Sequence, residues 1–280
     1  MRTSAEWVPP LSSLSRRDLL RIAGAGLAAV AGACSSGRAP GSVAVKDDGG
    51  RRKDSLRGRL TARPSAAVPA AGSHATGLLP LGLAGSNRDG ALYVPVSYRA
   101  ERPAPLVVVL HGAYGTGRRE LSRLLPLADE AGILLLAPDS RESTWDAVMG
   151  VYGPDVAFLD RALEQTFARY AVDPARIAAE GFSDGASYAL SLGITNGDLF
   201  THAMAFSPGL TAAAARHGSP KLFISHGTRD EVLPIDRCSR RIVPMLRRDG
   251  YDVLYQEFEG PHIVPAPIVR RAVDWFLSGA

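Results

Sequence analysis

The sequence predicts an α/β fold in which a mostly parallel sheet of about eight strands carries helices on both faces. Residues 106–110 form an unbroken run of Leu and Val, which is typical of a strand buried on both faces of a parallel sheet. Strand-like and helix-like segments then alternate to the end of the chain. With 280 residues, 46% of them hydrophobic, the chain can bury one substantial core.

The predicted elements begin with a hairpin. Residues 77–83 and 91–96 are strand-like, and residues 87–90, Asn-Arg-Asp-Gly, are a good turn sequence between them. Further strands are predicted at 106–110, 133–137, 177–180, 203–206, 222–225 and 253–258, and helices at 118–131, 155–170, 186–192, 237–248 and 264–277. Active sites of such sheets lie beyond the carboxyl ends of the strands, so polar residues at those positions are the candidates for function.

The first 75 residues differ in composition from the rest. They hold 12 Lys and Arg against 5 Asp and Glu, whereas residues 76–280 hold 20 against 23. The basic charge therefore belongs to the amino-terminal segment, and we expect no nucleic-acid surface. The predicted organisation is a signal peptide at 1–33, a disordered spacer at 34–75 that is poor in large apolar residues, and one large folded domain at 76–280.

Two resemblances in the first 34 residues concern export. Residues 15–20, Ser-Arg-Arg-Asp-Leu-Leu, resemble the twin-arginine motif, and the uncharged residues 22–33 suit a signal peptide but are too short to span a bilayer. The alternative is an amphipathic helix of the folded domain. Residues 31–34, Ala-Gly-Ala-Cys, resemble a bacterial lipobox, with Ala31 where Leu is usual.

These resemblances imply export by the twin-arginine machinery and a lipid anchor on Cys34 at the outer face of the cell membrane. The same residues, however, also fit an ordinary signal-peptidase site, which would release a soluble secreted protein. Both outcomes stay open at this point.

Residues 181–185, Gly-Phe-Ser-Asp-Gly, lie between a predicted strand and a predicted helix. A G-x-S-x-G pattern in that place is typical of a nucleophile elbow. The turn is so tight that Gly181 and Gly185 must lack bulk, and it pushes the hydroxyl of Ser183 into a cleft. The alternative is a glycine-rich connection without chemistry, and the residues that follow argue against it.

A serine hydroxyl becomes a nucleophile when a histidine takes its proton and a carboxylate holds that histidine. His262 follows the last predicted strand, and Asp230 lies on the loop after the strand at 222–225, with Glu231 as its neighbour and alternative. His217 and His226 precede this acid, whereas the order serine, acid, histidine requires a later base. We therefore predict that Ser183, Asp230 and His262 act together.

Residues 110–115 supply the remaining part of the predicted site. Their small residues allow the backbone to approach a substrate, and the N–H groups of Ala113 and Asp184 are the predicted oxyanion-hole donors. His111, together with Gly112, is expected to order this loop by hydrogen bonding. The side chain of Asp184 is expected to point away from the oxyanion, since two negative charges there would repel.

Tyr114 and Trp145 are candidates for the substrate pocket, although Trp145 fits equally well as a residue that packs a loop on the core. No long insertion precedes Asp230, so we expect no large lid. No metal cluster, phosphate-binding loop or dinucleotide fingerprint is recognisable, so neither a metal nor another cofactor is expected.

The His-Gly loop at 111, the elbow, the His-Gly-x-x-Asp loop at 226–230 and the terminal Pro-His at 261–262 together resemble the α/β-hydrolase superfamily. The pattern looks like the phospholipase/carboxylesterase and dienelactone-hydrolase-like esterases over roughly residues 90–280. Residues 172–177 also resemble polyhydroxyalkanoate depolymerase and feruloyl esterase relatives. One departure is Asp184, where relatives often carry Gln, Ala or Met.

The resemblance implies a serine esterase that cleaves a small-molecule carboxylic ester through an acyl-enzyme intermediate. A thioesterase or peptidase with the same three residues is the first alternative. The second is an inactive hydrolase-fold protein that binds a partner in the cell envelope. The intact order of the three residues argues against this second alternative.

Overall fold

A computed structural model of the chain describes residues 48–65, 75–84 and 88–278. Cys34 and the predicted export signals lie outside these residues. Within the described ranges, no helix is both long enough and apolar enough to cross a membrane.

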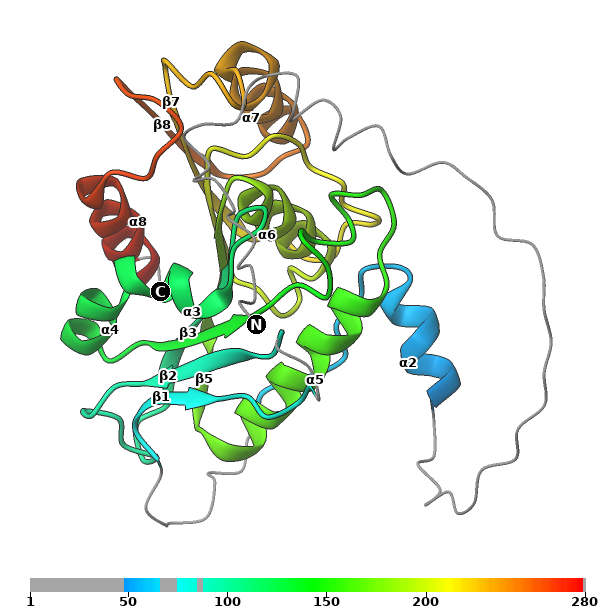
Figure 1. Cartoon of the computed structure of the whole chain (residues 1–280), viewed down its shortest axis with the longest axis vertical. Coiled ribbons are helices and arrows are strands. Elements are labelled where there is room, and N and C mark those ends of the chain that lie inside the picture. Colours follow the sequence, from blue (N-terminus) through cyan, green and yellow to red (C-terminus); the bar gives the residue numbers. More distant parts are fainter. Residues whose placement is uncertain (1–47, 66–74, 85–87, 279–280) are drawn as a thin grey trace, which may run out of the picture. The chain divides into compact units, whose positions relative to one another are not determined.

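An eight-stranded sheet in the order β1-β2-β4-β3-β5-β6-β7-β8 organises the described chain (Figure 1). The strands β1 and β2 form an antiparallel hairpin, β2 pairs antiparallel with β4, and all other neighbours are parallel. This confirms the predicted mostly parallel sheet. The bounds are β1 Gly77–Pro80, β2 Gly90–Val94, β3 Ala104–Leu110, β4 Leu134–Pro138, β5 Val172–Phe182, β6 His202–Phe206, β7 Lys221–Gly227 and β8 Val253–Phe258.

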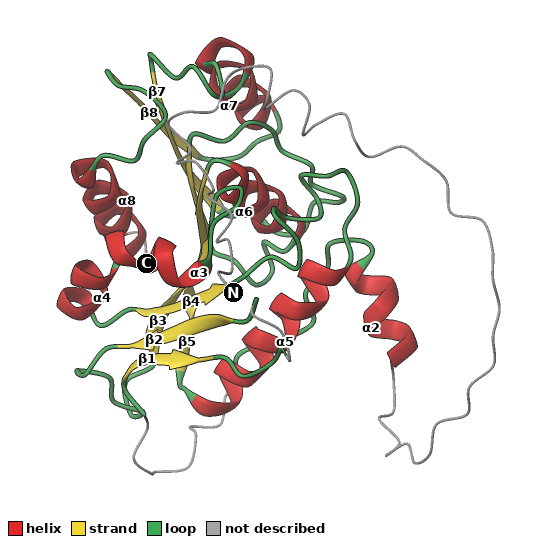
Figure 2. Cartoon of the chain, in the orientation of Figure 1, coloured by secondary structure: helices red, strands yellow, loops and turns green. Residues whose placement is uncertain are grey.

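Helices connect most of the parallel strands (Figure 2). The helices are α2 Asp48–Ser55, α3 Gly117–Glu120, α4 Leu125–Ala131, α5 Pro154–Arg169, α6 Asp184–Thr195, α7 Ser239–Arg248 and α8 Ala266–Ser278, with 3₁₀ turns at Leu121–Arg123 and Ile235–Arg237. The predicted helix at 118–131 is divided into three pieces. Pro126 lacks the N–H that a continuous helix would use, so α4 begins anew around it.

The buried strand β3 shows why the fold needs helices on both faces. Leu106, Val108 and Leu110 belong to the core cluster that includes side chains of α5 and α6. Val107 and Val109 belong to a second cluster, which includes side chains of α4 and α8. Successive side chains of a strand point to opposite faces, so the unbroken apolar run 106–110 reflects a strand covered on both sides.

The predicted disordered spacer is wrong for residues 48–65. The helix α2 opens this segment, and residues 56–65, here called the N-terminal strap, pack against the body of the protein. Leu60 is 1% exposed. The carboxylate of Asp160 in α5 accepts hydrogen bonds from the Thr61 N–H (2.7 Å), the Thr61 hydroxyl (2.6 Å) and the Ala62 N–H (2.8 Å). The predicted domain boundary at residue 76 is therefore too late.

Further polar contacts hold the strap on both sides of Thr61 and Ala62. The side-chain amide of Asn196 accepts from the Leu60 N–H and donates to the Gly58 carbonyl, both at 2.8 Å. Arg59 and Arg63 both pair with Asp198, and the Arg59 guanidinium in particular holds the pKa of that carboxyl well below its usual range. Apolar content did not reveal this segment because its attachment is mainly polar.

Replacing Asp160 with alanine should destabilise the protein by about 2–3 kcal/mol, because three hydrogen bonds to one charged acceptor are lost. Urea unfolding followed by circular dichroism measures this change, with Asp252→Ala, an exposed aspartate, as the control. Equal stability of the two variants would mean that the hydrogen bonds between Asp160 and the strap contribute nothing to the stability of the folded body.

Candidate active site

The turn between β5 and α6 forces Ser183 into a backbone conformation that residues other than glycine rarely adopt, with φ 58° and ψ −119°. Its N–H donates to the Phe206 carbonyl at 2.9 Å, which ties the turn to β6. A Cβ on Gly181 would lie 2.3 Å from the backbone of Gly185, and one on Gly185 would lie 2.0 Å from the Leu110 carbonyl oxygen. The structure confirms that this turn tolerates no side chain on either flank.

The three residues singled out from the sequence form one hydrogen-bonded chain. The Oγ of Ser183 lies 2.9 Å from the Nε2 of His262, and the Nδ1 of His262 lies 2.5 Å from the Oδ2 of Asp230. An ionised carboxylate can only accept, so Nδ1 carries the proton and Nε2 presents its lone pair to the serine hydroxyl. The arrangement can take a proton from Ser183 and stabilise the resulting imidazolium.

The carboxylate of Asp230 is fully buried. Its Oδ1 accepts from the N–H groups of Val232 (3.0 Å) and Leu233 (2.7 Å). Burial alone would raise the pKa of Asp230, but the contacts with His226 and His262 and the Leu233 N–H outweigh it and hold this pKa below its usual value. The acid is therefore ionised, whereas the neighbouring Glu231 is exposed.

Two backbone N–H groups beside Ser183 have no hydrogen-bond acceptor within the described residues: those of Ala113 and Asp184. Asp184 is the first residue of α6, where an N–H has no partner inside the helix. Gly112 lies so close that a Cβ there would be 3.6 Å from the Cβ of Ser183. Both groups are thus available to stabilise a negative oxygen near the serine.

His111 orders the loop that carries Ala113, as predicted. It is fully buried, and its Nε2 accepts from the Ser140 N–H at 2.9 Å, so Nδ1 carries the proton and donates to the Gly112 carbonyl at 2.7 Å. Burial lowers the pKa of His111, with a further contribution from the Arg88 guanidinium. The histidine is thus kept neutral, and its two hydrogen bonds hold the loop in place.

The prediction that Trp145 lines the substrate pocket is wrong. Trp145 is 1% exposed, stacks on Tyr188 with ring centroids 4.8 Å apart, and donates from Nε1 to the His111 carbonyl at 2.8 Å. Its large apolar ring belongs to the core and supports the loop from beneath. Tyr114, in contrast, is 49% exposed, and its place in the pocket stays a prediction.

One contact of Asp184 has no local signal in the sequence. The hydroxyl of Thr144 donates to the Oδ2 of Asp184 at 2.6 Å and so holds this carboxylate to the loop after β4. The two residues are 40 positions apart, and only their common place after strands of one sheet could have suggested the contact. This bond fixes the side chain of Asp184, the residue that departs from the usual sequence of the elbow.

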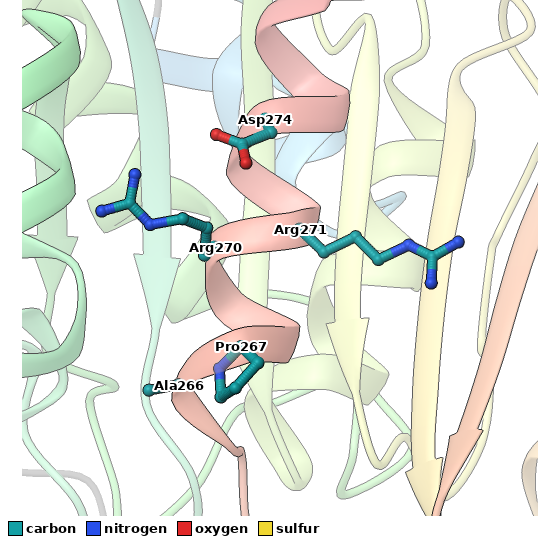
Figure 3. Close-up of a pocket in the computed structure, with 5 residues that line it drawn as sticks. All are labelled: Ala266, Pro267, Arg270, Arg271 and Asp274. Carbon is teal, nitrogen blue, oxygen red and sulfur yellow. The ribbon is translucent and has the colours of Figure 1, made fainter.

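A separate hollow of about 540 Å³ lies over α8 (Figure 3). Ala266, Pro267, Arg270, Arg271 and Asp274 line it. None of them belongs to the Ser183 site, and Arg270 is already paired with Glu130 of α4 at 2.8 Å.

No protein-family model matches the chain. Curated relatives include "Probable feruloyl esterase C" of Aspergillus niger, 28% identical over 159 residues, and "Feruloyl esterase C" of Emericella nidulans, 27% identical over 159 residues. Each match covers 54% of this chain and 58% of the relative, so the chain spans little more than half the length of the curated relatives it matches.

Solved structures resemble a larger part of the chain. Esterase PE8 has a TM-score of 0.57 at 22% identity, covering 72% of this chain and 99% of that one. A CE1 ferulic acid esterase from Anaeromyces mucronatus has a TM-score of 0.52 at 17% identity, covering 75% and 94%. These likenesses, with the sheet order above, show that the chain has the α/β-hydrolase fold.

Proposed function

We propose that the protein is a serine hydrolase that cleaves carboxylic esters. The observation that carries this proposal is the hydrogen-bonded chain from Ser183 through His262 to the buried, ionised Asp230. The relatives named as feruloyl esterases and the esterases among the structural neighbours support ester hydrolysis as the reaction.

In the proposed reaction, Oγ of Ser183 attacks the ester carbonyl carbon while its proton passes to Nε2 of His262. The carbonyl oxygen becomes an oxyanion, which the N–H groups of Ala113 and Asp184 stabilise. The tetrahedral intermediate collapses, the alcohol leaves with the proton from His262, and an acyl-serine remains. Water, deprotonated by His262, then attacks the acyl-serine, and the acid and the free enzyme are released.

The names of the relatives indicate where a substrate search begins. Feruloyl esters are esters of an aromatic acid, so methyl ferulate and related hydroxycinnamate esters belong in the first panel, beside nitrophenyl esters of increasing acyl length. A nitrophenyl thioester and a peptide anilide in the same panel compare the proposed ester preference with the thioesterase and peptidase alternatives.

Replacing Ser183 with alanine should lower ester hydrolysis by at least about 10⁴-fold, because the nucleophile is lost while the fold is kept. Steady-state kinetics on the active ester measures this, and a fluorophosphonate probe followed by peptide mass spectrometry identifies the reactive serine. Ser187, buried in α6, provides the matched control as Ser187→Ala in the labelling experiment. Labelling of a different serine in the wild type would reject the assignment.

Replacing Asp230 with asparagine should cut turnover by about 10³–10⁴-fold, because an amide can hold His262 in the wrong tautomer. Glu231→Gln changes the adjacent, exposed carboxylate in the same way and should leave turnover within about threefold of wild type. The comparison uses kcat on one ester for both variants. A larger loss in Glu231→Gln would identify the neighbour as the acid.

We further propose that the protein is exported folded through the twin-arginine machinery and held at the outer face of the membrane by a lipid on Cys34. The sequences at 15–20 and 31–34 support this proposal. The two chains of a diacylglycerol are enough for stable anchoring, whereas one chain binds only marginally.

Cys34→Ala should move the protein from the detergent phase to the medium, since the small residues at 31 and 33 still permit ordinary cleavage. Cys238→Ala, which changes a buried free cysteine, is the control and should partition as the wild type does. Arg16→Lys with Arg17→Lys should retain active enzyme inside the cell, unlike the paired control Arg118→Lys with Arg119→Lys. A wild-type protein found wholly in the aqueous phase would reject the lipid anchor.

A further inference from the structure

A second histidine contacts the acid of the proposed site. His226, in β7, is fully buried, and its Nε2 lies 2.8 Å from the Leu233 carbonyl oxygen and 3.2 Å from the Oδ2 of Asp230. The same oxygen accepts the hydrogen bond from Nδ1 of His262 at 2.5 Å. Two imidazoles, one at the end of β7 and one in the loop after β8, therefore share one carboxylate oxygen.

The neighbours of His226 determine which of its nitrogens carries the proton. Both groups near Nε2, a carbonyl and a carboxylate, can only accept, so Nε2 is protonated and donates. The Nδ1 lies 2.7 Å from the hydroxyl of Ser239, a fully buried residue that opens α7. In the neutral imidazole this nitrogen accepts, so the Ser239 hydroxyl donates to it.

The contacts of His226 connect the groups that bind the two carboxylate oxygens of Asp230. Leu233 gives its N–H to the Oδ1 of Asp230, and its carbonyl receives the N–H of His226. The same N–H also faces Oδ2. A rotation of the carboxylate would break contacts on both oxygens at once, so His226 restricts the direction in which Asp230 presents Oδ2 to His262.

We propose that His226 is a positioning residue of the active site, which holds the Asp230 carboxylate for His262 through the protonated Nε2. This inference rests on the proposed function, because it assigns a role in the same reaction. The ring nitrogens of His226 face Ser239, Leu233 and Asp230, so the histidine acts on the reaction through Asp230.

The other charged group facing His226 lies on the neighbouring strand. Glu257 of β8 is its register partner, and this carboxylate is paired with Arg240 of α7 at 2.6 Å. Arg240 and, to a smaller extent, His226 lower the pKa of Glu257, but the carboxylate that lies 3.2 Å from the Nε2 of His226 is that of Asp230, and the expected pH effect is assigned to this contact.

Three variants separate positioning from simple packing. His226→Leu removes both ring nitrogens, His226→Gln keeps an N–H donor near the position of Nε2, and His226→Asn keeps a polar group near Nδ1 that cannot reach Asp230. His217→Gln, on an exposed loop, is the matched control. Each full-length variant is tested for kcat and KM on the best ester, for its pH profile and for its thermal unfolding.

We expect His226→Leu to lower kcat by about 10²-fold at nearly constant KM, because a misplaced catalytic group costs about that much. The acid limb of its kcat/KM profile should move to lower pH, since an Asp230 carboxylate that is misdirected without its second donor stabilises the protonated His262 less. His226→Gln should restore kcat to within about fivefold and return the limb to its place, whereas His226→Asn should not.

The ranking of the two amide variants decides the question even where His226→Leu fails to fold. Asparagine equal to or better than glutamine in kcat would assign His226 to the Ser239 contact and overturn the inference, as would an unshifted acid limb in every variant. A wild-type protein that hydrolyses no ester and resists the fluorophosphonate probe would instead refute the proposed function itself.

Discussion

The site depends on one buried negative charge. Asp230 has lost its water, and a carboxylate in that position stays ionised only where hydrogen-bond donors replace the water. The loop after β7 supplies two backbone N–H groups, and His262 and His226 supply ring N–H groups from either side. The Oδ2 of this carboxylate accepts a hydrogen bond from Nδ1 of His262 and so keeps the proton of the neutral ring on that nitrogen. Nε2 can then accept the proton of Ser183.

The strained turn at Ser183 is the second constraint, and the sheet maintains it. Gly185 packs onto the end of β3 and Gly181 onto Gly185, so the elbow, the β3 strand end and the loop that follows it form one rigid contact. His111 and Trp145 then support that loop from the core with hydrogen bonds at 2.7–2.9 Å. A strained backbone at a functional residue persists only where the surrounding structure holds it in place. Here the ends of β3, β5 and β6 hold the turn at Ser183.

The sequence predicted what short-range patterns encode and missed what distant polar contacts encode. The strands, the elbow and the partners Asp230 and His262 follow from apolar runs, glycine spacing and order along the chain. Trp145 fits the pocket and the core equally well in the sequence, because a loop position does not reveal that Tyr188 stacks on its ring. The strap was missed for a similar reason, since Asp160 lies 99 positions from Thr61, and no local pattern joins them.

The strap also changes what a lipid on Cys34 would permit. With a spacer from 35 to 75, an anchored enzyme could range well over 100 Å from the membrane, at about 3.5 Å per extended residue. With the described body beginning at α2, residues 35–47 would be the link, and its greatest reach is about 45 Å by the same measure. Such a short connection would confine the proposed esterase to the membrane surface, so its substrates would have to reach it there. A glycine–serine insert between residues 40 and 41 lengthens this link without changing the strap. We therefore expect it to increase the cleavage of an ester that is immobilised on a particle too large to reach the membrane surface. Hydrolysis of a soluble ester should stay unchanged.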